Sequence, residues 1–179
     1  SIILCAYNAE SFIQETLEAI LNQSFKQFEL IIINDGSNDA TWEIINACND
    51  DRIIKIDHEL NLGLIESIRD GIKISQGEYI SKIDADDIPA YDLIERQVRI
   101  LDQLPKVGII GVGFLNIDKN GEELFISKRS ADNISIQWNI MFGSPITHSG
   151  VMIRKEILIQ NTLDYQKEFL HAEDYDLWS

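Results

Sequence analysis

Short apolar runs alternate with amphipathic segments through the first part of the chain. Four runs of mostly aliphatic residues predict buried strands, at Ile2–Cys5, Leu30–Ile33, Ile53–Ile56 and Tyr79–Ile83. Each run is followed by apolar residues at helical spacing, which predict helices near residues 12–21, 42–45, 64–72 and 93–101. Strand–helix pairs in succession predict an α/β fold, with a mostly parallel sheet and helices on both of its faces.

The pattern changes after about residue 105. Val107–Phe114 predicts a further strand, and Asn120-Gly121 between two short apolar runs is typical of a β-hairpin. A helix over Ser135–Met141 and a last strand over Val151–Ile153 are expected to follow. We therefore expect a single domain with two halves, residues 1–105 and residues 106–179, the second adding a small antiparallel extension.

The net charge of the chain limits the classes of ligand that it is expected to bind. Among 179 residues, 30 are Asp or Glu and 15 are Lys or Arg, which gives a formal net charge of −15. A nucleic acid is disfavoured, because binding its backbone relies on basic patches. A phosphate-bearing ligand remains compatible, because carboxylates can hold it through a divalent cation. The uncharged stretch Asn133–Ile153 keeps several polar residues and does not predict a membrane span.

The sequence has two cysteines, Cys5 in an apolar run and Cys48 at the end of a helical pattern. Neither a disulfide scaffold nor a zinc site is indicated, so we expect two buried thiols in a reduced, cytoplasmic compartment. The chain begins without Met inside a strand-like run and ends at Ser179, and we expect it to be a piece of a longer protein.

Polar clusters follow three of the predicted strands, at Ala6-Tyr7-Asn8, Asp35-Gly36-Ser37 and Asp84-Ala85-Asp86. The carboxyl ends of parallel strands share one edge of a sheet, where open α/β sheets bind ligands. We therefore expect the three clusters to converge on one cleft. The carboxylates of Asp84, Asp86 and Asp87 repel one another unless they share a cation, and such a site suits magnesium or manganese held partly by a phosphate.

Each candidate also has a plain structural interpretation. Asp84 and Asp86 could cap the next helix, and Asp35-Gly36-Ser37 could form a simple turn before one. Tyr7 could be a core aromatic residue, and Arg69 could be a solvated side chain. His148 could be a hydrogen-bonded core residue, and Glu173-Asp174 could mark the start of a helix.

Residues 1–45, including the segment Asn34-Asp35-Gly36-Ser37, resemble the N-terminal half of family 2 glycosyltransferases. Asp84-Ala85-Asp86 stands at the place of the Asp-x-Asp motif of that family. Residues 148–156 and Ala172-Glu173-Asp174 resemble its acceptor-side segment and its Glu-Asp motif. The resemblance covers nearly the whole chain in the right order. It implies the GT-A fold, a nucleotide-binding α/β sheet that uses a divalent cation, manganese or magnesium.

The resemblance also implies a role for each matching position. Ala6, Tyr7 and Glu10 would lie near the base and ribose of the nucleotide. Asp35 would hold the uracil, with Arg69 near the base. Asp84 would lie near the ribose and Ala85 near the nucleotide backbone. Asp86 would ligate the metal on the diphosphate, and Asp174 would be the general base. His148 and Glu173 would lie on the acceptor side, so that residues 1–105 bind the nucleotide sugar and residues 106–179 the acceptor.

The implied activity is the transfer of a sugar, with inversion, from a UDP-sugar to an acceptor hydroxyl in cell-surface polysaccharide biosynthesis. The acceptor would be a saccharide or a lipid-linked saccharide, and peripheral membrane association through regions outside this chain stays open. Two other functions stay open. One is a sugar nucleotidyltransferase, although Ala6–Glu10 is not the Gly-rich phosphate loop expected of it. The other is a non-catalytic nucleotide-binding module.

Overall fold

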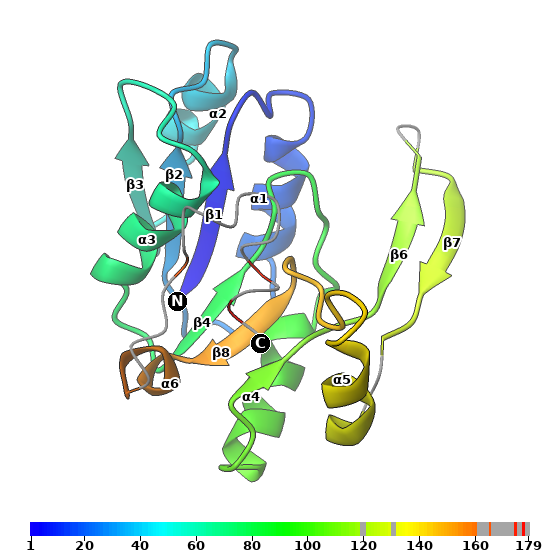
Figure 1. Cartoon of the computed structure of the whole chain (residues 1–179). Helices are drawn as coiled ribbons and strands as arrows, with labels where there is room; N and C mark the ends of the chain where they lie inside the picture. Colours follow the sequence, from blue (N-terminus) through cyan, green and yellow to red (C-terminus); the bar gives the residue numbers. More distant parts are fainter. Residues whose placement is uncertain (119–120, 130–131, 161–164, 166–173, 175–176, 178–179) are drawn as a thin grey trace.

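A computed structural model describes residues 1–118, 121–129, 132–160, 165, 174 and 177. The main body holds a sheet in the order β3-β2-β1-β4-β8-β5, and β6 and β7 form a separate hairpin (Figure 1). The strands are β1 (Ile2–Ala6), β2 (Leu30–Asn34), β3 (Ile53–Asp57), β4 (Tyr79–Lys82), β5 (Ile109–Ile110), β6 (Phe114–Ile117), β7 (Glu123–Ser127) and β8 (Val151–Arg154). The helices are α1 (Ile13–Leu21), α2 (Thr41–Ala47), α3 (Leu64–Ile74), α4 (Leu93–Gln103), α5 (Asn133–Asn139) and α6 (Lys155–Gln160).

The directions of the strands confirm the expected mostly parallel sheet. Strand β1 pairs in parallel with β2 and β4, and β2 pairs in parallel with β3. Strand β8 is antiparallel to both of its neighbours, β4 and β5. The hairpin of β6 and β7 is the expected small antiparallel extension. The α/β fold class is therefore confirmed.

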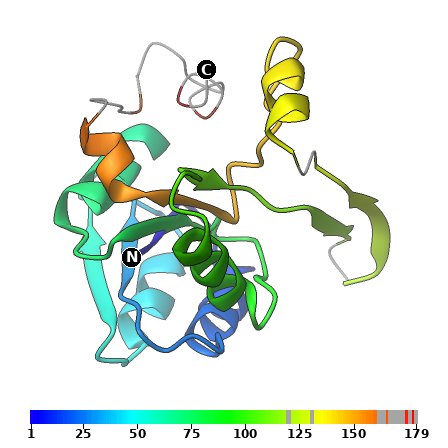
Figure 2. The ribbon, with the colours of Figure 1, turned by 90° about the horizontal axis from the view of Figure 1, so that it is seen from below.

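Two apolar layers cover the sheet, because successive strand residues point to opposite faces. In β1, Ile2 and Leu4 belong to the core with α1, α2 and α4, whereas Ile3 belongs to the core with α3 and α6. Figure 2 shows these two groups of helices on opposite sides of the sheet. Every residue of β2 is at most 2% exposed, so this strand lies in the middle of both layers.

The expectation of one strand over Val107–Phe114 is wrong. Strand β5 contains two residues, and Phe114 begins β6 instead. Glycine at three positions weakens the run, because glycine offers no side chain to pack and marks close approach of other groups. A Cβ on Gly111 would lie 2.7 Å from Cγ2 of Ile146, so the chain here makes room for a neighbour; the other two glycines are Gly108 and Gly113.

The helices of the second half differ from the expected ones. Helix α5 begins at Asn133 rather than Ser135, because the Asp132 side chain caps it by accepting from the Ser135 amide at 2.9 Å. Helix α6 was not expected. No helix in the part of the chain that the structure describes is both long enough and apolar enough to cross a bilayer.

Both cysteines are free, and each is half-buried rather than fully buried as expected. Burial raises the pKa of the Cys5 thiol to about 12. The thiol therefore stays protonated at neutral pH, which agrees with a packing role for this residue.

Candidate active site at the carboxyl edge of the sheet

The loops that follow β1 and β2 are joined by hydrogen bonds. The Asn8 amide donates to Oγ of Ser37 at 3.0 Å, and the Asn38 amide donates back to Oδ1 of Asn8 at 2.8 Å. The Ala40 amide donates to Oε2 of Glu10 at 2.9 Å. Two segments distant in sequence therefore form one surface at the carboxyl edge, as the parallel sheet predicts.

Tyr7 lies in this surface and is 50% exposed, so its interpretation as a core aromatic residue is wrong. Ala6, the last residue of β1, is 1% exposed, and its carbonyl accepts from the Asp35 amide at 2.8 Å. Glu10 is exposed and holds the start of α2 through Ala40. Of these three residues, Tyr7 and Glu10 present side chains to solvent.

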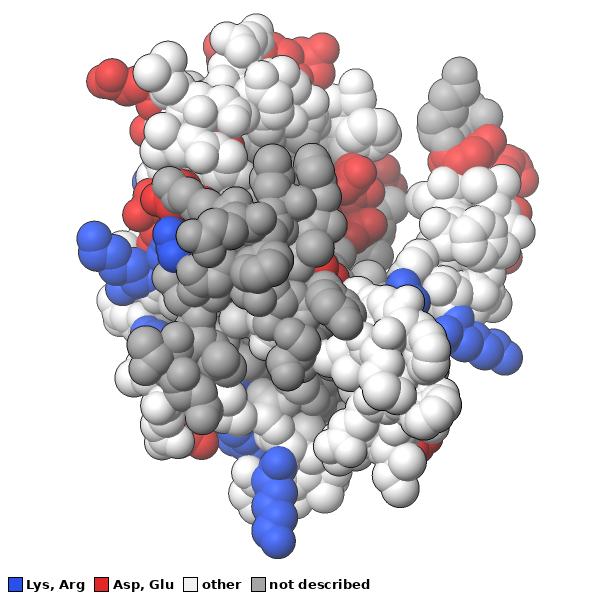
Figure 3. Space-filling model, viewed as in Figure 1, with Lys and Arg blue, Asp and Glu red and all other residues white. Residues whose placement is uncertain are grey.

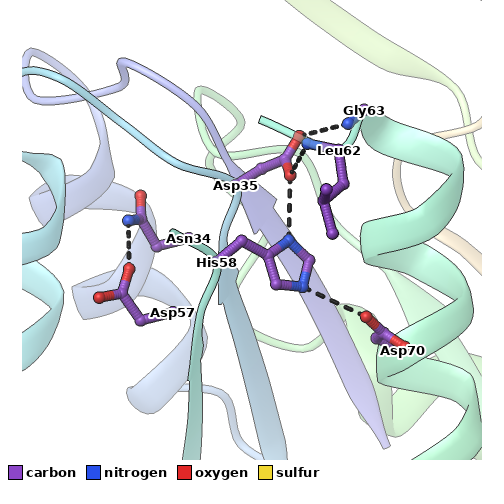
Figure 4. Close-up of polar contacts among 7 residues, drawn as sticks. All are labelled: Asn34, Asp35, Asp57, His58, Leu62, Gly63 and Asp70. Carbon is purple, nitrogen blue, oxygen red and sulfur yellow. Dashed lines mark hydrogen bonds and ion pairs between the residues drawn. The ribbon is translucent and has the colours of Figure 1, made fainter. Parts of the chain in front are cut away.

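Asp35 follows β2 and is 3% exposed. Its Oδ1 accepts from the Leu62 amide at 2.9 Å and lies 3.0 Å from Nδ1 of His58, while its Oδ2 accepts from the Gly63 amide at 2.9 Å (Figure 4). Nε2 of His58 in turn lies 3.2 Å from Oδ2 of Asp70 on α3. The carboxylate thus anchors the loop between β3 and α3, which is more than a simple turn requires.

Electrostatics agrees with this arrangement. Burial acts to raise the pKa of Asp35, but hydrogen bonds from His58 and from the amides of Leu62 and Gly63 outweigh it and hold the pKa below its usual range. The carboxylate is therefore ionised in the folded protein at neutral pH. Beside it, the Asn34 amide group donates to Oδ1 of Asp57 at 2.7 Å, which ties the ends of β2 and β3 together (Figure 4).

Gly36 lets the same loop lie directly on the end of β2. Its φ is +67°, and an added Cβ would lie 2.5 Å from both the Asn61 nitrogen and the Leu60 carbonyl carbon. The sequence alone did not single out His58 or the segment Asn61–Gly63 as part of the candidate site. A histidine directly after a strand and a glycine before a helix were the available signals, but neither indicates a partner in another loop.

Arg69 on α3 is half-buried and pairs with Glu66, with Nη1 2.9 Å from Oε1. Arg69 is therefore less solvated than its plain structural interpretation expects. It lies on the helix that begins at the anchored loop, one residue before Asp70. Its neighbour in the chain, Asp70, contacts His58 of the Asp35 network.

The segment after β4 carries the expected acidic cluster. Asp84 is half-buried, Ala85 is buried, and Asp86 and Asp87 are exposed. The Asp84 amide donates to Oγ of Ser149 at 3.1 Å, and the Ala85 carbonyl accepts from Oγ1 of Thr16 at 2.9 Å. Helix α4 has Asp92 as its N-cap, so the interpretation of Asp84 and Asp86 as caps of the next helix is wrong.

The carboxylates in this segment are close enough for the charges of two of them to change the pKa of the third. Although the Asp87 residue as a whole is exposed, partial burial of its carboxyl group and the charges of Asp84 and Asp86 raise the pKa of Asp87 above its usual range. A hydrogen bond with Ser149 acts in the opposite direction. No group of three or more His, Cys, Asp or Glu side chains among the described residues forms a complete metal site. One or two carboxylates with a diphosphate supplying the other oxygens is a common way to hold Mg²⁺, and the exposed Asp86 fits that donor set.

His148, an acceptor-side candidate, lies next to Ser149, which contacts the acidic segment after β4. Burial and the positive charge of Lys82 lower the pKa of His148 to about 4, whereas Asp84 and Asp174 act to raise it. Nε2 of His148 lies 3.1 Å from the Tyr165 hydroxyl, as its interpretation as a hydrogen-bonded residue expects. Asp174 accepts from Oγ of Ser144 at 2.9 Å. The segment before β8 thus contacts both Asp84, through Ser149, and Asp174, through Ser144, although the two acidic residues are 90 positions apart in the numbering. Glu173 lies outside the described residues.

Figure 3 shows acidic side chains on the main body facing an open cleft, with the β6–β7 hairpin on the other side of the cleft. The hairpin stands away from the body in both ribbon views (Figures 1 and 2). Its strands carry exposed apolar side chains, at Leu115, Ile117, Leu124, Phe125 and Ile126.

Solved structures share this fold. TarS from S. aureus, in complex with UDP, superimposes with a TM-score of 0.79 at 21% identity, covering 98% of this chain and 52% of TarS. The mannosyltransferase PcManGT from Pyrobaculum calidifontis, in complex with GDP-Man and Mn²⁺, gives a TM-score of 0.72 at 18% identity, covering 98% of this chain and 49% of PcManGT.

Sequence relatives are also glycosyltransferases. An uncharacterized glycosyltransferase of Haemophilus influenzae is 33% identical over 196 residues, which cover 100% of this chain and 58% of that protein. WfaP of Escherichia coli, a UDP-Glc:alpha-D-GlcNAc-diphosphoundecaprenol beta-1,3-glucosyltransferase, is 38% identical over 102 residues, covering 57% of this chain and 41% of WfaP. The first of these alignments shows that the chain spans little more than half of its relative's length. The family model "Glycosyl transferase family 2" matches residues 1–160, and the chain belongs to that family.

Proposed function

We propose that the protein transfers a sugar from a UDP-sugar to an acceptor hydroxyl with inversion at the anomeric carbon. The observation that carries the proposal is that the segment before β8 contacts both acidic residues, in a chain of family 2: Ser149 accepts from the Asp84 amide at 3.1 Å, and Ser144 donates to the Asp174 carboxylate at 2.9 Å. It brings an acidic strand end suited to a nucleotide diphosphate and a second carboxylate suited to proton transfer to one place. UDP is preferred as the nucleotide because TarS was solved with UDP and WfaP is named for UDP-Glc.

The donor would lie along the carboxyl edge. Tyr7 and Glu10 would border the base and ribose with Ala6, and Asp35 with its anchored loop would meet the uracil, with Arg69 nearby. Three donors of the chain already surround the Asp35 carboxylate, so we assign base recognition to Asp35 and the loop together. Asp84 and Ala85 would line the ribose and the nucleotide backbone.

Asp86 would hold a divalent cation together with the diphosphate. Such a cation, when bound, stabilises the negative charge that develops on the leaving diphosphate. The exposed position of Asp86 lets it meet a ligand from solvent, and the neighbouring Asp84 and Asp87 add negative charge. Manganese is the first cation to test, because PcManGT was solved with Mn²⁺.

Asp174 would act as general base. In the proposed step, the acceptor oxygen forms a bond to the anomeric carbon while the bond from that carbon to the diphosphate oxygen breaks. The electron pair of the broken bond leaves with UDP, and the hydroxyl proton passes to the Asp174 carboxylate. Attack from the face opposite the leaving group inverts the configuration. His148 and Glu173 are assigned to the acceptor side, and the acceptor class is a saccharide, free or lipid-linked, in polysaccharide assembly.

A donor panel tests the proposal. The full-length protein is incubated with UDP-glucose, UDP-N-acetylglucosamine, UDP-galactose and GDP-mannose, each with manganese, and with saccharide acceptors. Release of UDP together with a new glycoside of inverted configuration supports the proposal. In a parallel incubation with UTP and a sugar phosphate, formation of a nucleotide sugar with release of diphosphate would indicate a nucleotidyltransferase instead. Binding of UDP with no turnover for any donor and acceptor would indicate a binding module.

A further inference from the structure

Lys82, the last residue of β4, is a buried cation in the candidate site. It is 3% exposed, and its backbone pairs with Ile3 on β1 and Val151 on β8. Its carbonyl accepts from the Gly150 amide at 2.8 Å, so its position in the sheet is fixed. Lysine is almost never fully buried unless its ammonium group is paired, because desolvation of the charge is costly.

The partner of this ammonium group is the carboxylate of Asp84, two residues further along the chain. The Lys82 side chain is 4% exposed and the Asp84 side chain is 39% exposed, so only the acidic partner of the ion pair is open to solvent. The lysine holds the carboxylate from inside the protein while part of the carboxylate still faces solvent. Because Ser149 also fixes the Asp84 amide, both the backbone and the side chain of Asp84 are held.

The surroundings explain why this charge is retained. The positive charge of Lys82 acts to lower the pKa of three groups, which are Cys5 on β1, His148 before β8 and Asp87 in the acidic segment. Cys5 and His148 offer no negative charge at neutral pH, and of the two nearby carboxylates, Asp84 and Asp87, Asp84 is the one that forms the ion pair with Lys82. A buried ion pair adds little net stability compared with apolar residues of similar size. Stability alone therefore does not account for a lysine at this position.

We infer that Lys82 is a positioning residue that orients the Asp84 carboxylate toward the nucleotide sugar. The inference rests on the proposed function, in which Asp84 approaches the ribose. Lys82 acts through Asp84 and does not touch the ligand. Because the donor contact is made before and during transfer, loss of the lysine weakens donor binding more than turnover.

Binding of UDP with manganese, measured by calorimetry on the full-length protein, tests the inference. Lys82→Met is expected to weaken UDP about tenfold, comparably to Asp84→Asn, because a charge-assisted contact is lost. The double variant is expected to bind no more weakly than Asp84→Asn alone, since both changes remove the same contact. Lys82→Arg, which keeps the charge, is expected to recover part of the affinity. In turnover, Lys82→Met raises the donor KM and leaves kcat within about twofold.

Lys155→Met is the matched control. Lys155 is also a partly buried lysine held by a polar group, the Ser75 carbonyl, but it lies just after β8 at the opposite end of that strand. Its replacement is expected to leave UDP affinity unchanged. Equal affinity of Lys82→Met and wild type overturns the inference, as does a further loss when Lys82→Met is added to Asp84→Asn. Failure of the wild type to bind UDP at all overturns the proposed function, and with it the role of Lys82 in donor binding.

A folding measurement guards against a variant that merely misfolds. Asp84→Asn leaves the buried ammonium group without its counter-ion and is expected to lower the urea midpoint of unfolding in the wild-type background. In the Lys82→Met background the same change is expected to have little effect. An equal drop in both backgrounds means that the two side chains are not coupled and overturns the inference. If Lys82→Met does not fold, the UDP affinity of Lys82→Arg is measured instead. An affinity of Lys82→Arg as low as that of Asp84→Asn would then overturn the inference.

Discussion

The Asp35 carboxylate and the Gly63 amide, 28 residues apart, join the end of β2 to the start of α3 through a hydrogen bond of 2.9 Å. The Leu62 amide and the His58 imidazole complete the set around the same carboxylate. This one side chain fixes the path of the loop that borders the proposed base site. The loop is therefore part of the site architecture rather than a variable connection.

Asp35→Asn tests that anchoring. In the variant, the side-chain NH2 group of asparagine replaces a carboxylate oxygen that accepts a hydrogen bond in the wild type, so at least one donor loses its acceptor. We expect the free energy of unfolding to fall by about 2 kcal/mol. Urea denaturation at neutral pH measures the change. Asp51→Asn, at an exposed position after α2, is the control and is expected to have little effect.

Asp35→Asn is also expected to change how the free energy of unfolding depends on pH. Because the folded-state pKa of Asp35 lies below its unfolded value, its contribution to stability is present above the ordinary Asp pKa and is lost as the pH falls through the folded-state value. Asp35→Asn is expected to remove that part of the acid destabilisation. An identical dependence of unfolding free energy on pH below about 4 in variant and wild type would contradict the assignment.

Gly36→Ala tests the close approach of the loop. Its φ is +67° and its Cβ would meet the Leu60–Asn61 backbone at 2.5 Å, whereas Gly121 has φ +83° with nothing within 4 Å of an added Cβ. Both alanine variants are strained by the left-handed backbone, but only the first also displaces the loop. We expect Gly36→Ala to cost about 2 kcal/mol more than Gly121→Ala in unfolding free energy, and equal costs would contradict the packing.

Asp86→Ala tests the proposed cation contact. We expect manganese to strengthen UDP binding in the wild type and to have much less effect in the variant, because the carboxylate ligand is lost. Calorimetry with and without manganese measures the difference, with Asp51→Ala as control. Undiminished enhancement by manganese in Asp86→Ala would remove this residue from the proposed role.

Asp174→Asn tests the proposed base. Asparagine keeps the shape and can still accept from Ser144, but it cannot take up the acceptor proton. We expect kcat to fall by about a hundredfold to ten-thousandfold while UDP affinity is retained. Turnover close to that of the wild type would end the assignment.

His148→Gln tests the environment between the two carboxylates. The folded-state pKa of about 4 lies below the ordinary value of 6.5, so the unfolded chain binds more protons in between. Stability from this group is present above pH 6.5 and declines as the pH falls toward 4. We expect the stability of His148→Gln, followed by thermal unfolding from pH 4 to 7, to decline less steeply than that of the wild type.

The sheet was predictable from the sequence because its central strands are buried on both faces. Continuous runs such as Leu30–Ile33 have no other interpretation when turn residues follow them. Val107–Phe114 is as apolar, but its glycines break the pairing, and local pattern does not show which neighbour needs the space. The direction of β8 depends on long-range pairing with β4, which its short run does not encode.

The site was predictable only in part. The convergence of strand ends follows from parallel topology, so the clusters at Tyr7, Asp35 and Asp84 were expected. Asp174 came from family resemblance, because no spacing rule links it to β4. Lys82 was missed, because a lysine in a strand is ordinarily solvated and the sequence does not show that this one is buried and paired with Asp84. His58 was missed for a similar reason, since its partners come from two other segments.

The reversed direction of β8 determines which residues can serve this edge. A parallel strand offers the site only the residues after it, whereas a strand running the other way delivers the residues before it. His148 and Ser149 reach the acidic segment for this reason, with Ser144 and Thr147 just upstream. Sequence variation in that stretch can therefore remodel the proposed acceptor side, while the proposed nucleotide side, built from loops after β1, β2 and β4, stays the same.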